Sequence, residues 1–400
     1  MRIVNIEDYF IPDAGYQINI LPRYMVEFGH EVYIVTSTVE DIRGMPNNFF
    51  GIDNIKERDV EYTEKTGVKI VRVDPFIKKV ISGRIVHSKA LFRIVDDLCP
   101  DVVYAHGNDT LTGMRYLTKN KRNYAIVTDS HMLEMATKNR LNKVFYWFYR
   151  KTITPKIIKK RIPVIRTQDD TFVERNLGIP LSQAPWISYG SDTLLFHPDA
   201  NLKKTFRIQN NISINDFVVV YTGKLDDGKG GKLLAETFRE KFTTNRNIVL
   251  MVVGSTDGTY GREVEQIFSE SENRIIRFPT QRYYDLADFY QAADLSVFAK
   301  QCSLSFYDAQ ACGLPVLSED NNINVERNSH DNGLCFKADD IGDFRGKIET
   351  LANMPEDEYS EIANNSYNYI IDNFNYEFIA KKYLDIIIKE YERFNNIGND

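Results

Sequence analysis

Residues Ser296–Glu319 read SVFAKQCSLSFYDAQACGLPVLSE, a pattern that predicts a strand, a loop, a short helix and a second strand. The apolar run Leu295–Ala299 is typical of a buried strand end. A helix is expected over Phe306–Ala311, and Gly313 and Pro315 end it. A loop that leads into a helix N-terminus offers free N–H groups and a positive dipole end, so it suits a phosphate. The same pattern also occurs as an ordinary turn of an α/β domain.

The segment Asp308–Val316, DAQACGLPV, resembles the Glu-Ala-x-Ala-x-Gly-x-Pro-Val signature of retaining glycosyltransferase family 4. The resemblance implies an α/β protein of the GT-B fold, with two Rossmann-like domains facing each other across a cleft and a C-terminal helix that crosses back to the first domain. The family's paired glutamates correspond here to Lys300 and the shorter Asp308. The loop between them, with Ser303 and Ser305, is similar to a subgroup with Lys/Arg-Gln-x-Ser-x-Ser in place of Glu-Gly-Phe-Gly.

A second motif, Gly223–Gly230, reads GKLDDGKG and follows the expected strand Asp216–Thr222. Lys224 and Lys229 bracket a glycine-bearing loop before the expected helix Lys232–Phe242. Two ammonium groups beside a helix N-terminus suit a diphosphate, although a pair of lysines is more often a solvated surface. The motif resembles the family's Gly-Arg-Leu…Lys-Gly, in which both cations grip the diphosphate of the donor.

Three further residues of this half are expected near the donor. The segment Ile248–Gly254 predicts a strand followed by a glycine turn, and Gly254 is expected near the donor. Phe278 and Pro279 end the next strand and resemble the family segment that meets the nucleotide base through backbone groups.

The first half opens with a strand at Arg2–Ile6, a loop containing Gly15 and Tyr16, a helix, and a second strand at Glu31–Thr38. This βαβ pattern predicts a parallel Rossmann-like sheet. His106 and His131 each follow an expected strand, and ligands bind at the carboxyl ends of parallel strands. A single histidine is more often structural. By its resemblance to the family's Thr-x-His-Asp turn, His131 is expected to contact the donor sugar.

The segment Lys138–Arg161 carries nine Lys or Arg residues and no acid, interleaved with apolar and aromatic residues. Such a stretch can lie on an anionic membrane surface, each cation contributing about 1 kcal/mol. The alternative is a buried helix with a solvated basic face, because Phe145, Phe148 and Tyr149 fit helical spacing.

Composition narrows the function class. The chain has 400 residues, enough for two domains, and its net charge of −6 argues against a nucleic-acid binder. Its four cysteines lack metal-ligand spacing and indicate reduced thiols in the cytoplasm. The N-terminus runs into a strand, so no signal peptide is expected, and no apolar run reaches the ~18 residues of a spanning helix.

We therefore expect three regions: an acceptor-side domain over residues 1–198, a nucleotide-sugar-binding domain over 199–370, and a helix over 371–400 that returns to the first domain. The resemblance implies a retaining glycosyltransferase without a cofactor, acting on a nucleotide-diphospho-sugar and a glycan or lipid-linked acceptor. Because lysine charges and helix dipoles can replace a divalent metal ion, we expect it to be metal-independent. The alternatives are a catalytically silent nucleotide-sugar-binding subunit, motivated by Lys300, and a GT-B nucleotide-sugar epimerase. The expected site residues are Lys224, Lys229, His131 and Asp308 for catalysis; Gly15, Gly223, Gly254, Phe278, Pro279, Lys300, Ser303, Leu304, Ser305 and Asp308 for the donor; and His106 and Tyr16 on the acceptor side.

Overall fold

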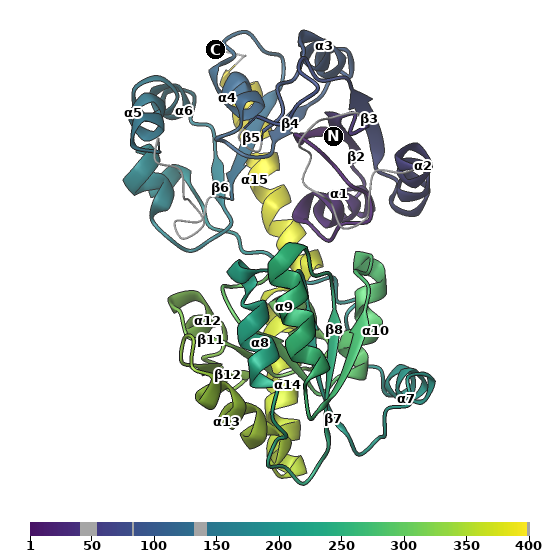
Figure 1. Ribbon diagram of the computed structural model, residues 1–400. Helices are drawn as coiled ribbons and strands as arrows, with labels where there is room; N and C mark the ends of the chain where they lie inside the picture. The colour runs from purple at the N-terminus through teal and green to yellow at the C-terminus, as the bar shows by residue number, and fades with distance from the viewer. Residues whose placement is uncertain (41–53, 82–83, 132–141, 398–400) are drawn as a thin grey trace. The chain divides into compact units, whose positions relative to one another are not determined.

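The computed structural model describes residues 1–40, 54–81, 84–131 and 142–397. The chain divides into two compact units, which are described separately. Unit 1 comprises Met1–Tyr189 and Tyr376–Asp400, and unit 2 comprises Gly190–Asn375. The first boundary therefore lies nine residues before the expected position 198, and the second lies at Asn375 where 370 was expected. Figure 1 traces the chain from the purple N-terminus to the yellow C-terminal helix.

The described part of unit 1 contains one six-stranded parallel sheet in the order β3-β2-β1-β4-β5-β6. Strands that are covered on both faces read as continuous apolar runs, and the residues of β4 are all buried. The strands are β1 (Arg2–Ile6), β2 (Glu31–Ser37), β3 (Lys69–Val73), β4 (Val102–Ala105), β5 (Ala125–Ser130) and β6 (Val164–Arg166).

Helices cover this sheet, and the C-terminal helix is one of them. Residues of α15 pack against α1 and β5, as Figure 1 also shows. In α1, Ile18, Leu21 and Met25 are buried, as their helical spacing predicts. The helices are α1 (Gln17–Glu27), α2 (Ile55–Thr66), α3 (Lys89–Asp97), α4 (Leu111–Thr118), α5 (Asn142–Thr152), α6 (Thr154–Lys160), the π-helix η2 (Val173–Leu177), the 3-10 helix η3 (Leu181–Gln183) and α15 (Tyr376–Ile397).

Unit 2 holds a second parallel sheet of six strands among its residues, in the order β12-β11-β10-β7-β8-β9. The chain runs outward from β7 to β9, returns to β10 beside β7, and then runs outward on the other side. The pair β7 and β10 is therefore the topological switch point, where ligands bind in such sheets. The strands are β7 (Phe217–Thr222), β8 (Ile248–Val253), β9 (Arg274–Phe278), β10 (Leu295–Phe298), β11 (Val316–Glu319) and β12 (Gly333–Phe336).

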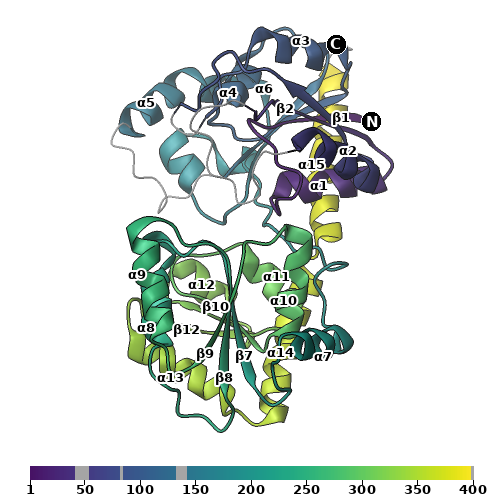
Figure 2. The ribbon, with the colours of Figure 1, turned by 45° about the vertical axis from the view of Figure 1, so that its right-hand side comes forward.

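Figure 2 shows α8 and α9 on one side of this sheet and α10 and α11 on the other. The helix expected over Lys232–Phe242 ends earlier, at Thr237, and Phe242 packs edge-on against Phe238 in the core. The elements are α7 (Ala200–Gln209), the 3-10 helix η4 (Asp227–Lys229), α8 (Gly231–Thr237), α9 (Gly258–Ser269), the 3-10 helix η5 (Tyr283–Asp285), α10 (Leu286–Ala292), α11 (Ser305–Ala311), α12 (Asn322–Arg327), α13 (Ile341–Ala352) and α14 (Glu356–Asn373).

A buried ion pair fastens α7 to the sheet of unit 2. The Asp294 carboxylate lies 2.7 Å from Arg207 Nη2 and 2.7 Å from Lys203 Nζ, and it accepts a hydrogen bond from the Val218 backbone N–H. Arg207 and Asp294 are both buried, so each satisfies a charge that would otherwise be costly in the core.

Among the helices that the structure describes, none is long and apolar enough to cross a membrane.

Candidate functional site

In unit 2, the loops that follow β7 and β10 touch each other at the switch point. A Cβ placed on Gly230 would lie 2.8 Å from Lys300 Cγ and 3.1 Å from Ala299 Cβ. Gly230 also has a φ of +74°, a conformation that suits glycine. Glycine therefore lets the lysine-bearing loop pack directly against the Lys300 loop, and the structure brings together the two motifs that the sequence singled out.

The loops after β7, β8 and β9 are joined through their backbones. Gly223 N–H donates to the Val253 carbonyl at 3.0 Å, and Gly254 N–H donates to the Phe278 carbonyl at 3.1 Å. Gly223 and Gly254 have φ values of +136° and +153°. The expected donor-binding residues Gly223, Gly254 and Phe278 are thus consecutive parts of one sheet edge.

The three lysines of this edge differ in their surroundings. Lys224 Nζ lies 3.3 Å from an Asp257 carboxylate oxygen. Lys229 is half-buried at the end of η4, where its backbone N–H donates to the Asp226 side chain. Lys300 Nζ lies 2.7 Å from Asp339, and the hydrogen bond to that carboxylate raises the pKa of Lys300. An ammonium group beside a helix N-terminus can bind an anion, so these three side chains are candidate ligands for a phosphate.

The loop that carries Ser303, Leu304 and Ser305 is held by a residue that the sequence did not single out. Arg327, buried on α12, donates from Nη1 to the Ser303 carbonyl at 2.9 Å, and its guanidinium lies 4.8 Å from the ring centroid of Tyr307. Ser305 N–H points to Ser303 Oγ at 3.3 Å. No spacing rule reveals Arg327, because it meets this loop only in the folded chain.

Asp308 lies inside unit 2. It is buried, and its Oδ1 accepts a hydrogen bond from Ser191 Oγ at 2.7 Å, while the Tyr283 hydroxyl lies at 3.4 Å. Burial raises the pKa of Asp308 to about 7; the Ser191 hydrogen bond works against this rise and the charge of Asp192 adds to it. The hydrogen-bond partner of Asp308 in this structure is therefore Ser191, which is 117 residues away in the sequence.

Phe278 and Pro279 end β9 at the same edge. Phe278 packs against Phe206 and Phe289, with ring centroids 6.1 and 4.9 Å away. Pro279 is exposed, and its carbonyl accepts a hydrogen bond from Gln281 Nε2 at 2.9 Å. The Phe278 ring is thus occupied in packing against these two phenylalanines.

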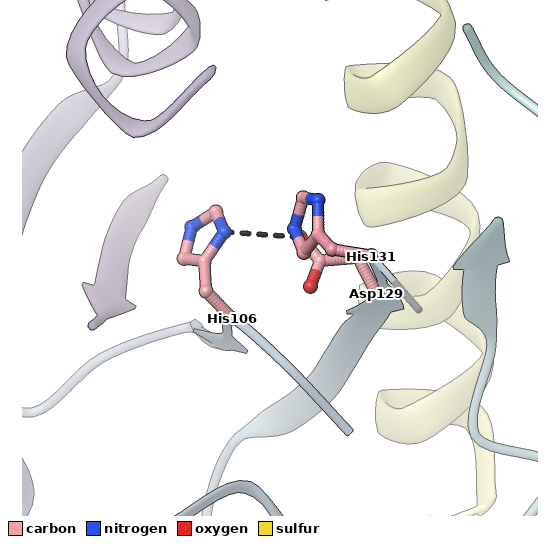
Figure 3. A group of neighbouring side chains, drawn as sticks. All are labelled: His106, Asp129 and His131. Atoms are coloured by element: carbon pink, nitrogen blue, oxygen red, sulfur yellow. Dashed lines mark hydrogen bonds and ion pairs between the residues drawn. The ribbon is translucent and has the colours of Figure 1, made fainter. Parts of the chain in front are cut away.

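In unit 1, a buried carboxylate links the two histidines that the sequence singled out. Asp129 Oδ2 lies 3.0 Å from His106 Nδ1, 3.1 Å from His131 Nε2 and 2.8 Å from the Tyr104 hydroxyl. Its Oδ1 accepts the Gly107 backbone N–H at 2.7 Å. Figure 3 shows the two imidazoles next to this carboxylate at the end of β5. Because Asp129 and His131 are two residues apart at a strand end, they point to the same side.

The second nitrogen of each histidine also has a partner. His106 Nε2 lies 3.1 Å from Asn5 Oδ1, and His131 Nδ1 lies 2.6 Å from the Tyr189 hydroxyl. His106 is buried, whereas the side chain of His131 is 37% exposed. His106 is therefore placed to hold Asp129, and His131 reaches the surface of unit 1.

The titratable side chains of this cluster have pKa values that are shifted in different directions. Burial alone lowers the pKa of His131, but the Asp129 carboxylate holds it well above its usual value. Burial alone raises the pKa of Asp129, yet the charges of His131 and His106 keep it well below its usual range. Glu7, which follows β1, differs: burial and the neighbouring Asp8 raise its pKa to about 8. One carboxylate beside His131 is thus ionised and the other is largely protonated at neutral pH.

His106, Asp129 and His131 form a group that could hold a metal ion, since one ligand atom from each lies within 4.8 Å of the others. Two imidazoles and a carboxylate are ligands that Zn²⁺ accepts. In this structure the facing atoms are instead hydrogen-bonded to one another, with Tyr104 as a further donor to Asp129.

Gly15 and Tyr16 lie just before α1, and Tyr16 is 56% exposed. The buried Asp8 organises the neighbouring loop, because it accepts the Ile85 backbone N–H at 3.1 Å and lies 3.5 Å from His87 Nε2. Gly15 and Tyr16 therefore lie at a strand-to-helix turn of unit 1, as the βαβ pattern predicted.

Comparisons with known proteins agree with this architecture. Residues 216–354 match the family model "Glycosyl transferases group 1". The chain is 24% identical over 221 residues to a D-inositol 3-phosphate glycosyltransferase of Rhodococcus erythropolis, covering 52% of this chain and 49% of that protein. It is 23% identical to a probable sucrose-phosphate synthase of Thermosipho melanesiensis, covering 50% of this chain and 46% of that protein. The chain thus spans about half the length of these curated relatives.

Solved structures match over nearly the whole chain. A glycosyltransferase from Rickettsia africae superposes with a TM-score of 0.72 at 14% identity, covering 97% of this chain and 98% of that one. Anabaena HepE in complex with UDP and glucose gives 0.70 at 16% identity, covering 97% and 100%. These likenesses and the two parallel sheets confirm the predicted α/β fold class, GT-B with two Rossmann-like domains.

Proposed function

We propose that this protein is a glycosyltransferase that moves a sugar from a nucleotide-diphospho-sugar to a glycan or lipid-linked acceptor with retention of configuration, in surface polysaccharide or glycolipid synthesis. The observation that carries the proposal is the contact between the Gly223–Gly230 and Lys300–Ser305 loops at the switch point of unit 2. Both loops lie within the residues that match the group 1 glycosyltransferase model.

In this proposal, Lys224 and Lys229 neutralise the charge that develops on the departing nucleotide diphosphate. Ser303 and Ser305 bind oxygens of the nucleotide sugar. Asp308 gives up its hydrogen bond with Ser191 and accepts a hydrogen bond from a hydroxyl group of the nucleotide sugar instead. The acceptor oxygen attacks the anomeric carbon from the face of the leaving group, and its proton passes to the departing phosphate. Lysine charges do the work of a divalent ion, so EDTA should leave turnover unchanged; activity lost with EDTA and restored by Mg²⁺ or Mn²⁺ would contradict metal independence.

The test is a thermal-shift panel of UDP, GDP, ADP, CDP and their common sugars on wild type, Lys229→Ala and Lys204→Ala. Lys204 is an exposed lysine of α7 and serves as the matched control. A ligand at about a hundred times its dissociation constant stabilises a protein by about 2.7 kcal/mol. We expect a shift with one nucleotide class that disappears in Lys229→Ala only. The absence of any shift would overturn donor binding.

A second candidate function is a nucleotide-sugar-binding subunit without transfer. Lys300 favours this candidate, because it stands at the position where glycosyltransferase family 4 has the first of its two glutamates. Its ammonium group is paired with Asp339 in this structure. Turnover of the bound nucleotide sugar by the wild-type protein would contradict this second candidate function. Binding without turnover, with activity created by Lys300→Glu, supports it.

We further propose that α5 and α6 lie on an anionic membrane surface. Trp147 and Val144 are each 64% exposed, and Phe148 and Ile158 are each 43% exposed. Tyr149, Ile153 and Ile157 of the same segment are buried, so its apolar residues divide between the core and the surface. A surface cavity of about 630 Å³, lined by Arg150, Thr154, Pro155, Ile158, Lys159 and Gly178, adjoins this face. Residues 138–141 of the predicted basic stretch lie outside the described residues.

Co-sedimentation with vesicles that contain anionic lipid tests this surface. Lys160 is unsuitable for substitution, because its ammonium donates to the Leu117 and Lys119 carbonyls. We expect Lys156→Glu/Lys159→Glu to reduce binding, because each cation near such a surface contributes about 1 kcal/mol. Lys56→Glu/Lys204→Glu has the same change of charge elsewhere and should bind as wild type does. Equal binding by all three proteins would overturn this proposal.

A further inference from the structure

A short segment of unit 1, residues 76–81, leaves several apolar side chains uncovered. It follows β3, and the exposed fractions are 74% for Phe76, 37% for Ile77 and 44% for Ile81. Single exposed apolar residues are common on protein surfaces, but three in one short segment form a patch. Lys78 and Lys79 lie between them in the chain and are exposed as well. These residues are called the 76–81 surface below.

The base of this segment is fixed to the core of unit 1. Ile81 and Arg84 exchange two backbone hydrogen bonds, at 2.9 and 3.0 Å. Ile85 is fully buried, and its N–H donates to the carboxylate of the buried Asp8 at 3.1 Å. The apolar side chains of the 76–81 surface are therefore presented to solvent from a support that the fold holds in place.

The loop after β4 connects this support to α5. The Asp109 carboxylate pairs with the guanidinium of Arg84. The preceding residue, Asn108, donates from Nδ2 to the Tyr149 hydroxyl oxygen at 3.2 Å, and its carbonyl lies 3.1 Å from the same oxygen. Two consecutive residues thus hold the base of the 76–81 surface and the helix α5, whose exposed face is proposed above to lie on a membrane.

The composition of the 76–81 surface fits a lipid bilayer. A side chain that is 74% exposed, as Phe76 is, stands clear of its neighbours and does not line a pocket for a single hydrocarbon chain. The chain between Asp74 and Asp96 carries five Lys or Arg residues and no acid, so its charge favours an anionic surface. Lysine stems lie along apolar material while their ammonium groups reach the polar headgroups, as in an amphipathic interfacial segment.

We propose that the 76–81 surface inserts its apolar side chains into an anionic bilayer beside α5, with Lys78 and Lys79 at the lipid headgroups. This inference rests on the proposed membrane association of unit 1 and adds a second contact, outside the basic stretch 138–161. It brings the ends of β1 and β4, where Asp8 and Asp109 hold the segment, close to the bilayer. An acceptor that is anchored in lipid then reaches this edge of unit 1 without leaving the membrane.

The first experiment is co-sedimentation with vesicles of phosphatidylcholine mixed with phosphatidylglycerol. The variant Phe76→Ser/Ile77→Ser/Ile81→Ser should bind at least about tenfold more weakly than wild type, because burial of such side chains is lost. The matched control is Leu194→Ser/Ile208→Ser/Ile214→Ser, which changes three residues of unit 2 that are 75%, 65% and 64% exposed. It should bind as wild type does. Equal binding by the two triple variants would overturn the inference.

The second experiment asks whether residue 76 enters the hydrocarbon layer. The chain has two tryptophans, and Trp147→Phe/Trp186→Phe removes both. In that background, the fluorescence of Phe76→Trp should shift to the blue on binding to vesicles and should be quenched by phosphatidylcholine with brominated acyl chains. Leu194→Trp in the same background should show neither change. A Phe76→Trp protein that binds vesicles without quenching would contradict insertion.

The remaining outcomes separate this inference from its alternatives. In sedimentation velocity without lipid, wild type and the 76–81 triple variant should sediment alike; a wild-type dimer that the triple variant dissociates would show that a second copy covers this surface and would overturn the proposal. Weaker vesicle binding by the triple variant, with unchanged binding by Lys156→Glu/Lys159→Glu, would refute the α5 and α6 surface and support the 76–81 surface. The opposite result would refute the 76–81 surface alone.

Discussion

A Cβ on Gly254 would lie 1.9 Å from the carbonyl oxygen of Gly223. The two glycines follow the adjacent strands β7 and β8, and their backbones pack against each other at the edge where the donor is proposed to bind. Nothing larger than hydrogen fits between them unless one loop moves.

Gly254→Ala should therefore displace the Gly223–Gly230 loop and destabilise unit 2. Overpacking costs about 1–3 kcal/mol, and the φ of +153° adds backbone strain. Chemical denaturation measures the loss. Gly346→Ala on α13 is the control: a Cβ placed on Gly346 would have no atom within 4 Å, so this change should stabilise the helix by about 0.5–1 kcal/mol. Equal stability of the two variants would contradict the close approach.

Asp308 should make stability fall with rising pH. Burial raises its pKa from 3.8 to about 7, so the folded chain keeps a proton that the unfolded chain has lost between these values. The stability contribution falls across that window, by on the order of 4 kcal/mol at most, and is level above it. Urea denaturation at pH 4 to 8 measures the slope. Asp308→Asn should flatten it, whereas Asp385→Asn, at an exposed site on α15, should leave it unchanged.

The contribution of Asp294 to stability should change with pH in the opposite direction: it should increase as the pH rises. Burial by itself raises its pKa, but Lys203 and Arg207 lower it overall. Its contribution is present above the unfolded pKa and is lost as the pH falls through the folded value. Asp294→Asn leaves Arg207 buried without its charge partner and should cost about 3–5 kcal/mol. Lys203→Met removes the more exposed partner and should cost much less; equal losses would show that burial of the pair is unimportant.

Arg327 should control donor affinity without touching the donor. Arg327→Met keeps an apolar side chain but removes the hydrogen bond to the Ser303 carbonyl, so the Ser303–Ser305 loop loses its support. We expect about tenfold weaker nucleotide-sugar binding by calorimetry with the fold intact. Arg345→Met is a matched control, because Arg345 also bonds carbonyls and stacks on a phenylalanine, at Phe242. Unchanged affinity in Arg327→Met would refute this role.

Much of the architecture was predictable because strand and helix periodicity are local properties. The runs at Leu295–Ala299 and Ile248–Gly254 predicted strands, and β10 (Leu295–Phe298) and β8 (Ile248–Val253) lie there in the sheet of unit 2. The helix expected at Phe306–Ala311 is present one residue longer. Helix ends were less predictable, as at Thr237, because side-chain packing of Phe238 and Phe242 ends the helix before its periodicity does.

By itself, the sequence determined the two Rossmann-like units, the lysine and serine loops at strand ends, and the histidines at the edge of unit 1, since each depends on neighbouring residues and on the alternation of strands and helices. Tertiary structure alone decided the partners: Ser191 for Asp308, Arg327 for Ser303, Asp339 for Lys300, and Tyr189 for His131. These contacts join residues far apart in the chain, and the physical reason is that a buried charge or carbonyl takes whichever donor the packing of separate elements brings within reach.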